Sequence, residues 1–149
     1  MLSVGRDRSG LFAPGVAEYA KRLQHYARTE LKELPESRAS GDKARTEEGE
    51  ALLGKLSPRD DLVALDERGK ELTTLELAQW LGKQQQTGRD LAFVIGGDEG
   101  LGDELRGRAR LVLCLSRFTL PHRLARLILV EQLYRAFTVL RGEAYHRGG

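Results

Sequence analysis

The order of apolar and polar positions along the chain predicts alternating strands and helices. Short apolar runs bounded by charges or glycine indicate buried strands, whereas apolar residues three and four apart indicate one face of a helix. The strand pattern occurs at 1–4, 31–34, 61–66, 91–95 and 111–115. The helix pattern occurs at 14–28, in a charged segment that starts as a loop at 35 and ends near 56, and at 73–86, 103–108 and 122–140. This alternation predicts an α/β fold with a mostly parallel sheet flanked by helices.

Local signals indicate where two of these helices begin. Pro14 stands in the first turn of the first helix, where its missing N–H group costs nothing. Thr73 and Glu76 have the spacing of a capping box, in which each side chain accepts a hydrogen bond from the other residue's main chain. A chain of 149 residues is long enough for one hydrophobic core. We therefore expect a single domain over residues 1–149.

Charge is distributed unevenly along a chain that is almost neutral overall. The formal net charge is +2 at pH 7. Residues 106–149 nevertheless contain nine arginines and only two acidic residues, whereas residues 1–105 contain fifteen basic and twenty acidic residues. A basic C-terminal third is typical of a protein that meets an anionic partner such as RNA.

The composition also disfavours several classes of protein. No apolar run approaches the roughly 20 residues of a membrane-spanning helix, so no membrane association is expected. The single cysteine, Cys114, cannot form an intramolecular disulfide, and its apolar neighbours favour a small buried side chain over a nucleophile. Three widely separated histidines do not have the spacing of metal ligands, and we expect no metal. The first ten residues lack the apolar core of a signal peptide, which favours a cytoplasmic protein.

A glycine-rich segment, 96–102, follows the predicted strand 91–95. Glycine lets the main chain approach a ligand closely, and ligands of α/β proteins bind at the carboxyl ends of strands. The glycine spacing matches neither the dinucleotide-binding fingerprint nor the P-loop. These residues alone leave two interpretations open, a tight turn and the floor of a ligand site.

The loop 115–122 joins a predicted strand to the last helix and carries two hydroxyl side chains and an aromatic ring. Its main-chain groups could bind the edge of a flat heterocycle such as adenine, while Leu115, Phe118 and Leu120 supply apolar walls. The alternative is structural, with Thr119 as a helix cap and Phe118 in the core.

The last predicted helix, 122–140, is apolar almost all round, so more than one of its sides must be covered. One side can pack on the sheet and another on a second copy of the chain. Complete burial within one small domain is the alternative. Arg123, Arg126 and Arg135 fall on or near one rim, where they could meet phosphates or keep the edge of a dimer in solution.

The chain that follows this helix contains Tyr145, His146 and Arg147. Tyrosine can stack on an unpaired base, histidine can transfer a proton near neutral pH, and arginine can bind a phosphate. The alternative is a frayed terminus without a function.

Several segments together resemble one known family. They are VALDERGK (63–70), VIGGDEGLGDEL (94–105), LSRFTLPHRLARLILVEQLYRAF (115–137) and RGEAYHR (141–147), with VGR and EYAKRL nearer the N-terminus. In this combination and order they closely resemble the RlmH (YbeA) family of SPOUT methyltransferases over nearly the whole chain. The first strand is shorter than the family's usual opening. The segment GGDEG differs from relatives at its two central positions, so Asp98 and Glu99 receive no role.

The resemblance implies a fold, a cofactor and a substrate. The fold would be α/β with a deep trefoil knot at the C-terminal end, which is a rare exception among proteins. The enzyme would use S-adenosylmethionine to methylate N3 of a pseudouridine in 23S ribosomal RNA, with the assembled ribosome as substrate. The cofactor site carried over by motif consists of Leu65, Gly96, Leu115, Ser116, Arg117, Phe118, Thr119 and Leu120.

The resemblance also implies an assembly and a set of catalytic residues. The last helix would form a homodimer, and the tail would approach the target base near the cofactor of one subunit or its partner. His146 is the candidate proton acceptor, Tyr145 a stacking platform and Arg147 a phosphate contact, while the enzyme's main task is positioning. Two other hypotheses are a SPOUT methyltransferase that acts on tRNA and a non-catalytic ribosome-binding protein.

Overall fold

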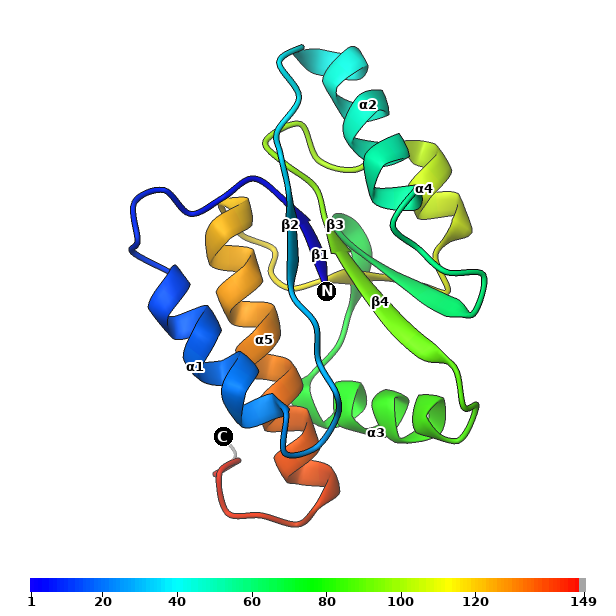
Figure 1. The fold of residues 1–149 in the computed structure, drawn as a ribbon. Helices are drawn as coiled ribbons and strands as arrows, with labels where there is room; N and C mark the ends of the chain where they lie inside the picture. Colours follow the sequence, from blue (N-terminus) through cyan, green and yellow to red (C-terminus); the bar gives the residue numbers. More distant parts are fainter. Residues whose placement is uncertain (148–149) are drawn as a thin grey trace.

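Residues 1–147, which the computed structural model describes, form five strands and five helices that alternate along the chain (Figure 1). The strands are β1 (Leu2–Val4), β2 (Lys32–Leu34), β3 (Asp60–Glu71), β4 (Asp90–Ile95) and β5 (Leu111–Cys114). The helices are α1 (Ala13–Leu23), α2 (Gly41–Leu53), α3 (Thr74–Gln85), α4 (Asp103–Arg108) and α5 (His122–Leu140). Residues 148 and 149, which the single-domain prediction includes, lie outside the described part.

All five strands lie in one sheet in the order β2-β1-β4-β3-β5, and every pairing is parallel. This confirms the predicted fold class and makes the sheet wholly rather than mostly parallel. β3 and β4 pair from Asp60↔Asp90 to Leu65↔Ile95, and β5 joins β3 through Leu65↔Leu113. The ends of the apolar runs in β3, β4 and β5 therefore meet at one edge of the sheet. The threading of the predicted knot stays an expectation drawn from the family.

β3 continues further than its apolar run predicts. The predicted strand ends at 66, whereas the observed strand reaches Glu71. Its pairing with β5 breaks after Leu65 and resumes at Lys70, so residues 66–69 bulge out of the ladder. Gly69 lies against β5 so closely that an ideal Cβ would be 2.7 Å from the carbonyl carbon of Val112. Apolar periodicity could not reveal this bulge because its residues are mostly charged.

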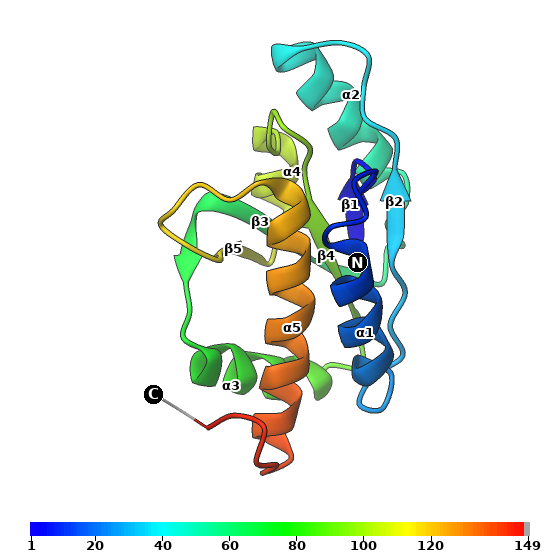
Figure 2. The ribbon, with the colours of Figure 1, turned by 90° about the vertical axis from the view of Figure 1, so that its left-hand side faces the viewer.

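Helices cover both faces of the sheet, with α1, α3 and α5 on one face and α2 and α4 on the other (Figures 1 and 2). Successive strand residues point to opposite faces, which divides the apolar side chains between two cores. The core under α1, α3 and α5 includes Val63, Phe93, Ile95, Leu113, Leu129 and Leu133. The core under α2 and α4 includes Val4, Leu52, Leu62, Val94, Leu101 and Leu105.

The ends of two helices show what the local sequence signals can establish. The capping box is confirmed, because the main-chain N–H of Glu76 donates to Thr73 Oγ1 at 3.2 Å and that of Thr73 donates to Glu76 Oε2 at 2.7 Å. The first helix, in contrast, ends at Leu23 rather than at 28. There the side-chain carbonyl of Gln24 accepts a hydrogen bond from the main-chain N–H of Thr29 at 3.1 Å and closes a turn.

α5 has the predicted bounds and lies between α1 and α3 against the sheet (Figure 2). Much of its apolar surface is therefore covered within one chain. By helical periodicity Leu124, Leu127 and Ile128, which are half-buried, fall on the side opposite the buried Leu129 and Leu133. Burial within one chain therefore explains much of the apolar helix, and the contact with a second copy stays a prediction.

The prediction that the α5 arginines lie on a rim is wrong for Arg126. Arg126 is only 4% exposed, and its guanidinium donates to the main-chain oxygen of Gly5 at 2.6 Å and to Glu33. Arg123 donates to the main-chain oxygen of Arg6 and pairs with Glu36, and Arg135 pairs with Glu131. Arg123 and Arg126 reach acceptors at the ends of β1 and β2, beside which α5 packs, whereas Arg135 pairs within α5 itself.

Candidate active site

A cavity of about 280 Å³ lies where β3, β4 and β5 end. Four segments line it, namely the bulge after Leu65, the glycine-rich segment after Ile95, the loop after β5, and the first turn of α5. Its volume is near the lower end of the roughly 300–1,000 Å³ range of small-molecule sites, and its position is where α/β proteins bind ligands.

The structure brings together most of the residues predicted to bind a cofactor. Seven of the eight line this cavity: Leu65, Gly96, Leu115, Ser116, Phe118, Thr119 and Leu120. The eighth, Arg117, is exposed and is not part of the cavity wall. These residues come from three segments that are distant in sequence and adjacent only because their strands are neighbours in the sheet.

The structural alternative for the loop after β5 is wrong. The N-cap residue of α5 is Pro121, without a capping side-chain hydrogen bond, so Thr119 caps no helix. Phe118 is 84% exposed rather than part of a core. Ser116 instead stabilises the loop locally, since its Oγ accepts a hydrogen bond from the main-chain N–H of Phe118 at 2.9 Å.

The glycine-rich segment is both a tight turn and a wall of the cavity. The main-chain N–H of Gly100 donates to the oxygen of Gly97 at 3.0 Å, and Gly100 adopts φ +72°, a left-handed conformation that glycine tolerates. An ideal Cβ at Gly96 would lie 2.7 Å from the carbonyl carbon and oxygen of Gly100. The turn can close only because position 96 has no side chain.

Charged residues that the motifs did not identify also line the cavity. Asp66 and Arg106 form an ion pair in its wall, and His122 lines it at the start of α5. Asp98, to which the sequence assigned no role, places Oδ1 3.0 Å from Nδ1 of His122. In the sequence, only their position at the ends of strands or helices could have suggested that these residues line the cavity.

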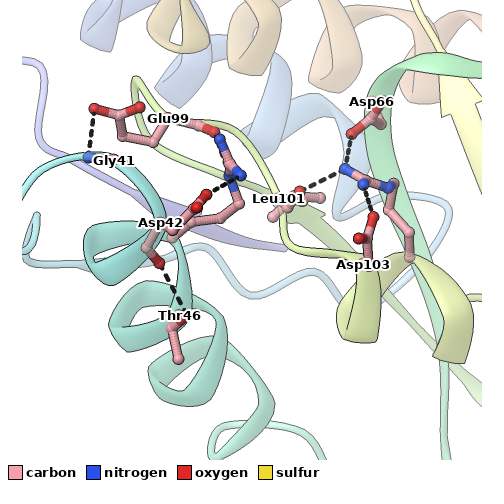
Figure 3. A network of polar contacts seen from close by, with 9 residues as sticks. Gly41, Asp42, Thr46, Asp66, Glu99, Leu101 and Asp103 are labelled. Carbon is pink, nitrogen blue, oxygen red and sulfur yellow. Dashed lines mark hydrogen bonds and ion pairs between the residues drawn. The ribbon is translucent and has the colours of Figure 1, made fainter.

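Two arginines hold the glycine-rich segment, and Figure 3 labels the residues that they contact. Arg45 of α2 donates to the main-chain oxygen of Glu99 at 3.0 Å and pairs with Asp42 at 2.7 Å. Arg106 of α4 donates to the oxygen of Leu101 and to Asp66. Burial acts to lower the pKa of Arg106, but its hydrogen bonds to Asp66 and Asp103 outweigh burial and raise that pKa. The guanidinium is therefore charged wherever the protein is folded.

The predicted catalytic residues do not lie at this cavity. They follow α5 at the end opposite to His122, and Gly142 turns the chain back with φ +67°. The Tyr145 hydroxyl lies 3.2 Å from the Tyr19 hydroxyl and donates to Glu131 Oε1 at 3.2 Å. Its ring centroid is 4.7 Å from that of Tyr134. The tail is thus docked against α1 and α5 of its own chain.

The other two tail residues are less engaged than Tyr145. Within residues 1–147, Nδ1 of His146 is buried and has no hydrogen-bond partner. Arg147 is exposed, and its main-chain N–H donates to the oxygen of Tyr145 at 3.1 Å. Among residues 1–147, Tyr145 is therefore the tail residue whose side chain is held by other side chains.

Cys114 is buried at the inner end of the cavity, as its apolar neighbours predicted, and its thiol donates to the main-chain oxygen of Ser116 at 3.1 Å. Among the residues described, no group of three or more His, Cys, Asp or Glu side chains is placed to hold a metal ion. In the same part of the chain, every helix is too short or too polar to cross a membrane.

Residues 1–146 match the model of the family described as "Predicted SPOUT methyltransferase". The chain belongs to this family. Among its relatives, the protein named Ribosomal RNA large subunit methyltransferase H of Anaeromyxobacter dehalogenans (strain 2CP-C) is 57% identical over 149 residues, which cover 99% of this chain and 97% of the relative. The protein of the same name from Gloeobacter violaceus (strain ATCC 29082 / PCC 7421) is 44% identical with the same coverage.

A solved structure supports the fold. The probable methylase family protein from Haemophilus influenzae Rd KW20 superposes with a TM-score of 0.55 at 15% identity, and the match covers 99% of this chain and 69% of that one. At this identity the likeness shows the fold alone. The predicted cofactor, S-adenosylmethionine, agrees with membership of this methyltransferase family.

The chemistry of the cavity fits S-adenosylmethionine. Leu65, Leu115 and Leu120 supply apolar surface for a flat heterocycle. The bare main chain at Gly96 and the loop 115–120, whose amides belong to no helix or strand, can bind polar edges. Carboxylates in the wall suit a ligand that carries hydroxyl, ammonium and sulfonium groups.

Proposed function

We propose that this protein transfers the methyl group of S-adenosylmethionine to N3 of a pseudouridine in 23S ribosomal RNA, on assembled ribosomes. The cavity at the ends of β3, β4 and β5 carries the proposal, because seven residues matched to the cofactor motifs line it. The names of the relatives support ribosomal RNA as the substrate. A single domain over residues 1–149 and a cytoplasmic location accompany this proposal.

Residues of the cavity would hold the cofactor mainly through main chain and apolar surface. Gly96 and the loop 115–120 present amide groups, and Leu65 and Leu120 present apolar side chains. When bound, S-adenosylmethionine supplies a methyl group already activated on a sulfonium centre. The chain's remaining task is to orient the target base and to accept one proton.

We assign the role of proton acceptor to His146 and a contact with an RNA phosphate to Arg147. The N3 imide must lose its proton as the nitrogen attacks the methyl carbon, and an imidazole can accept a proton near neutral pH. Tyr145 does not suit this role, because burial and then its contacts with Tyr19 and Glu131 raise the pKa of its phenol well above the usual value. Since its ring also contacts Tyr134 and Arg135, we interpret Tyr145 as the anchor of the tail rather than a free stacking platform.

The separation of cavity and tail favours a homodimer. His122 lines the cavity at one end of α5, and the tail follows Leu140 at the other. A helix of 19 residues is about 28 Å long at 1.5 Å per residue. Because the tail is docked at the far end, we propose that the catalytic tail at each cavity comes from a second copy. The half-buried Leu124 and Ile128 provide apolar surface on α5 for that contact, whereas Leu127 packs over Gly15 of α1.

Transfer of labelled methyl from S-adenosylmethionine tests the proposal. The substrates are large ribosomal subunits that lack the modification, assembled ribosomes, free 23S ribosomal RNA and tRNA, with the labelled nucleotide mapped by mass spectrometry. We expect label on N3 of one pseudouridine in the ribosomal particle. A variant truncated after Gly142 should bind the cofactor without transferring methyl. Label on tRNA would show that tRNA, and not ribosomal RNA, is the substrate. Cofactor binding without transfer to any RNA would favour a non-catalytic ribosome-binding protein.

A further inference from the structure

We propose that Arg106 is a positioning residue that fixes the distance between two walls of the cofactor cavity. One wall is the bulge at residues 66–69, and the other is the glycine-rich segment 96–102. The inference rests on the proposed function, because it treats the cavity as the S-adenosylmethionine site. It concerns an arginine and an aspartate that the cofactor motifs do not include.

The contacts of Arg106 join the two walls through one guanidinium (Figure 3). Its Nη1 donates to Asp66 Oδ2 at 2.9 Å and to the main-chain oxygen of Leu101 at 2.5 Å. Its Nη2 pairs with Asp103 in the first turn of α4. Asp66 begins the bulge and Leu101 ends the tight glycine turn, so a single planar group binds the glycine-rich segment, the bulge and the helix.

Asp66 is occupied on both of its oxygens. While Oδ2 accepts from Arg106, Oδ1 accepts from the main-chain N–H of Arg68 at 2.9 Å and so closes the turn within the bulge. The side chain of Asp66 is 8% exposed and that of Arg106 is 16% exposed. Loss of Arg106 would leave this buried carboxylate with only the more distant and exposed Arg68, whose Nε is 4.0 Å from Oδ1, so the bulge would be held less firmly.

The two arginines beside the glycine-rich segment join it to different parts of the fold. Arg45 joins the segment to α2 alone, and its carboxylate partner Asp42 is 95% exposed. Arg106 is the one of the two that also contacts the bulge. Since glycine-rich main chain loses much conformational freedom on ordering, an unanchored segment would bind its ligand less tightly.

Arginine suits this task better than lysine would. Its fixed fork can donate to a carboxylate and a carbonyl in a set geometry, whereas an ammonium group is a point charge on a flexible stem. We therefore expect Arg106→Lys to retain part of the effect. The conservative variant should keep the attraction to Asp66 and lose the simultaneous contact with Leu101.

Calorimetric titration with S-adenosylmethionine provides the first test. We expect Arg106→Ala and Asp66→Asn to weaken binding by about 10- to 100-fold, which is the scale of a small misplacement of binding groups, and Arg106→Lys to weaken it by less. In steady-state assays KM for S-adenosylmethionine should rise, whereas KM for the ribosomal particle should not. Arg89→Ala is the control, because Arg89 pairs with the buried Asp61 at 2.7 Å at the opposite end of β3.

Hydrogen exchange without any cofactor supplies an independent readout. Amides of 66–69 and 96–102 should exchange faster in Arg106→Ala than in the wild type, and Arg89→Ala should leave them unchanged. The inference is overturned if Arg106→Ala is folded and binds like the wild type, or if Arg89→Ala weakens binding equally. If Arg106→Ala does not fold, Arg106→Lys decides by the same criteria. Absence of binding by the wild type would instead overturn the proposed function and this inference together.

Discussion

Gly96 contributes to the cavity because it has no side chain. An ideal Cβ at this position would lie 2.7 Å from the main-chain carbonyl of Gly100, and that carbonyl belongs to a closed turn. We expect Gly96→Ala to weaken S-adenosylmethionine binding by about tenfold or more, since the displaced wall misplaces its neighbours. Gly107→Ala is the matched control, because α4 leaves open space at that position. Calorimetry that found equal affinities for the two variants would contradict the prediction.

Asp7 organises the loop before α1 through its carboxylate. It accepts hydrogen bonds from the Ser9 hydroxyl at 2.6 Å and from the main-chain N–H groups of Phe12 and Ala13 at 2.7 and 2.8 Å. These bonds, first that of Ser9, lower the pKa of Asp7 to about 2. Because this pKa lies below that of the unfolded chain, the stabilisation is complete above pH about 5 and is lost as the pH falls towards about 2.

Thermal unfolding of Asp7→Asn across this range measures the effect. The melting temperature of the wild type should exceed that of the variant by a constant difference from pH 7 to about 5. Below pH about 5 this difference should shrink steadily. Asp42→Asn is a suitable control, because its exposed carboxylate makes a surface pair with Arg45. If the difference for Asp7 does not change with pH, the loop is not held by the ionised carboxylate.

At the residue scale, the sequence identified groups that act through the main chain and missed groups that act through charge. Glycines after a strand and a loop before a helix are visible as local patterns, and the structure brings them into one cavity. The pairing of Asp66 with Arg106 joins residues 40 positions apart. No local pattern indicates such a pair, because it depends on a bulge whose charged residues show no periodicity.

At the element scale, α5 and its tail act as one unit. The Tyr145 hydroxyl contacts Tyr19 and Glu131, which are 126 and 14 positions away in the sequence. Periodicity predicted the bounds of α5 because nearly every helical turn contributes a buried apolar residue. It could not predict where the tail docks, because that position depends on an aromatic cluster shared between α1 and α5.

We expect Tyr145→Phe to lower kcat without changing KM for S-adenosylmethionine. The variant keeps the ring contact with Tyr134 and loses both hydroxyl contacts, so the tail is held less firmly while the cavity is unaltered. Glu131→Gln removes the charged acceptor and should lower kcat similarly. Because both variants break the same contact, that between Tyr145 and Glu131, their effects should not add in the double variant. Additive losses, or a raised cofactor KM, would show that Tyr145 does not anchor the tail through Glu131.

At the scale of the whole molecule, the parallel sheet brings the cofactor residues together and α5 keeps the tail away from them. The residues matched to the cofactor motifs meet because their strands are neighbours in the sheet, and the alternation of strands and helices made this predictable. The separation of the tail from the cavity depends on the position of α5, which has His122 at the cavity and Leu140 at its other end. Under the proposed function, the cofactor cavity and the catalytic tail of one chain lie in two places, which a two-fold dimer could unite.

Complementation between two inactive variants tests that arrangement. Gly96→Ala impairs the cavity and truncation after Gly142 removes the tail, so each variant alone should be inactive at limiting S-adenosylmethionine. After unfolding and refolding together in equal amounts, half of the dimers should be mixed, and each mixed dimer should contain one intact cavity facing one intact tail. We therefore expect about a quarter of the wild-type activity, as random pairing in a two-fold dimer requires. If cavity and tail of one chain acted together, the mixture would stay inactive, because neither variant contains both parts.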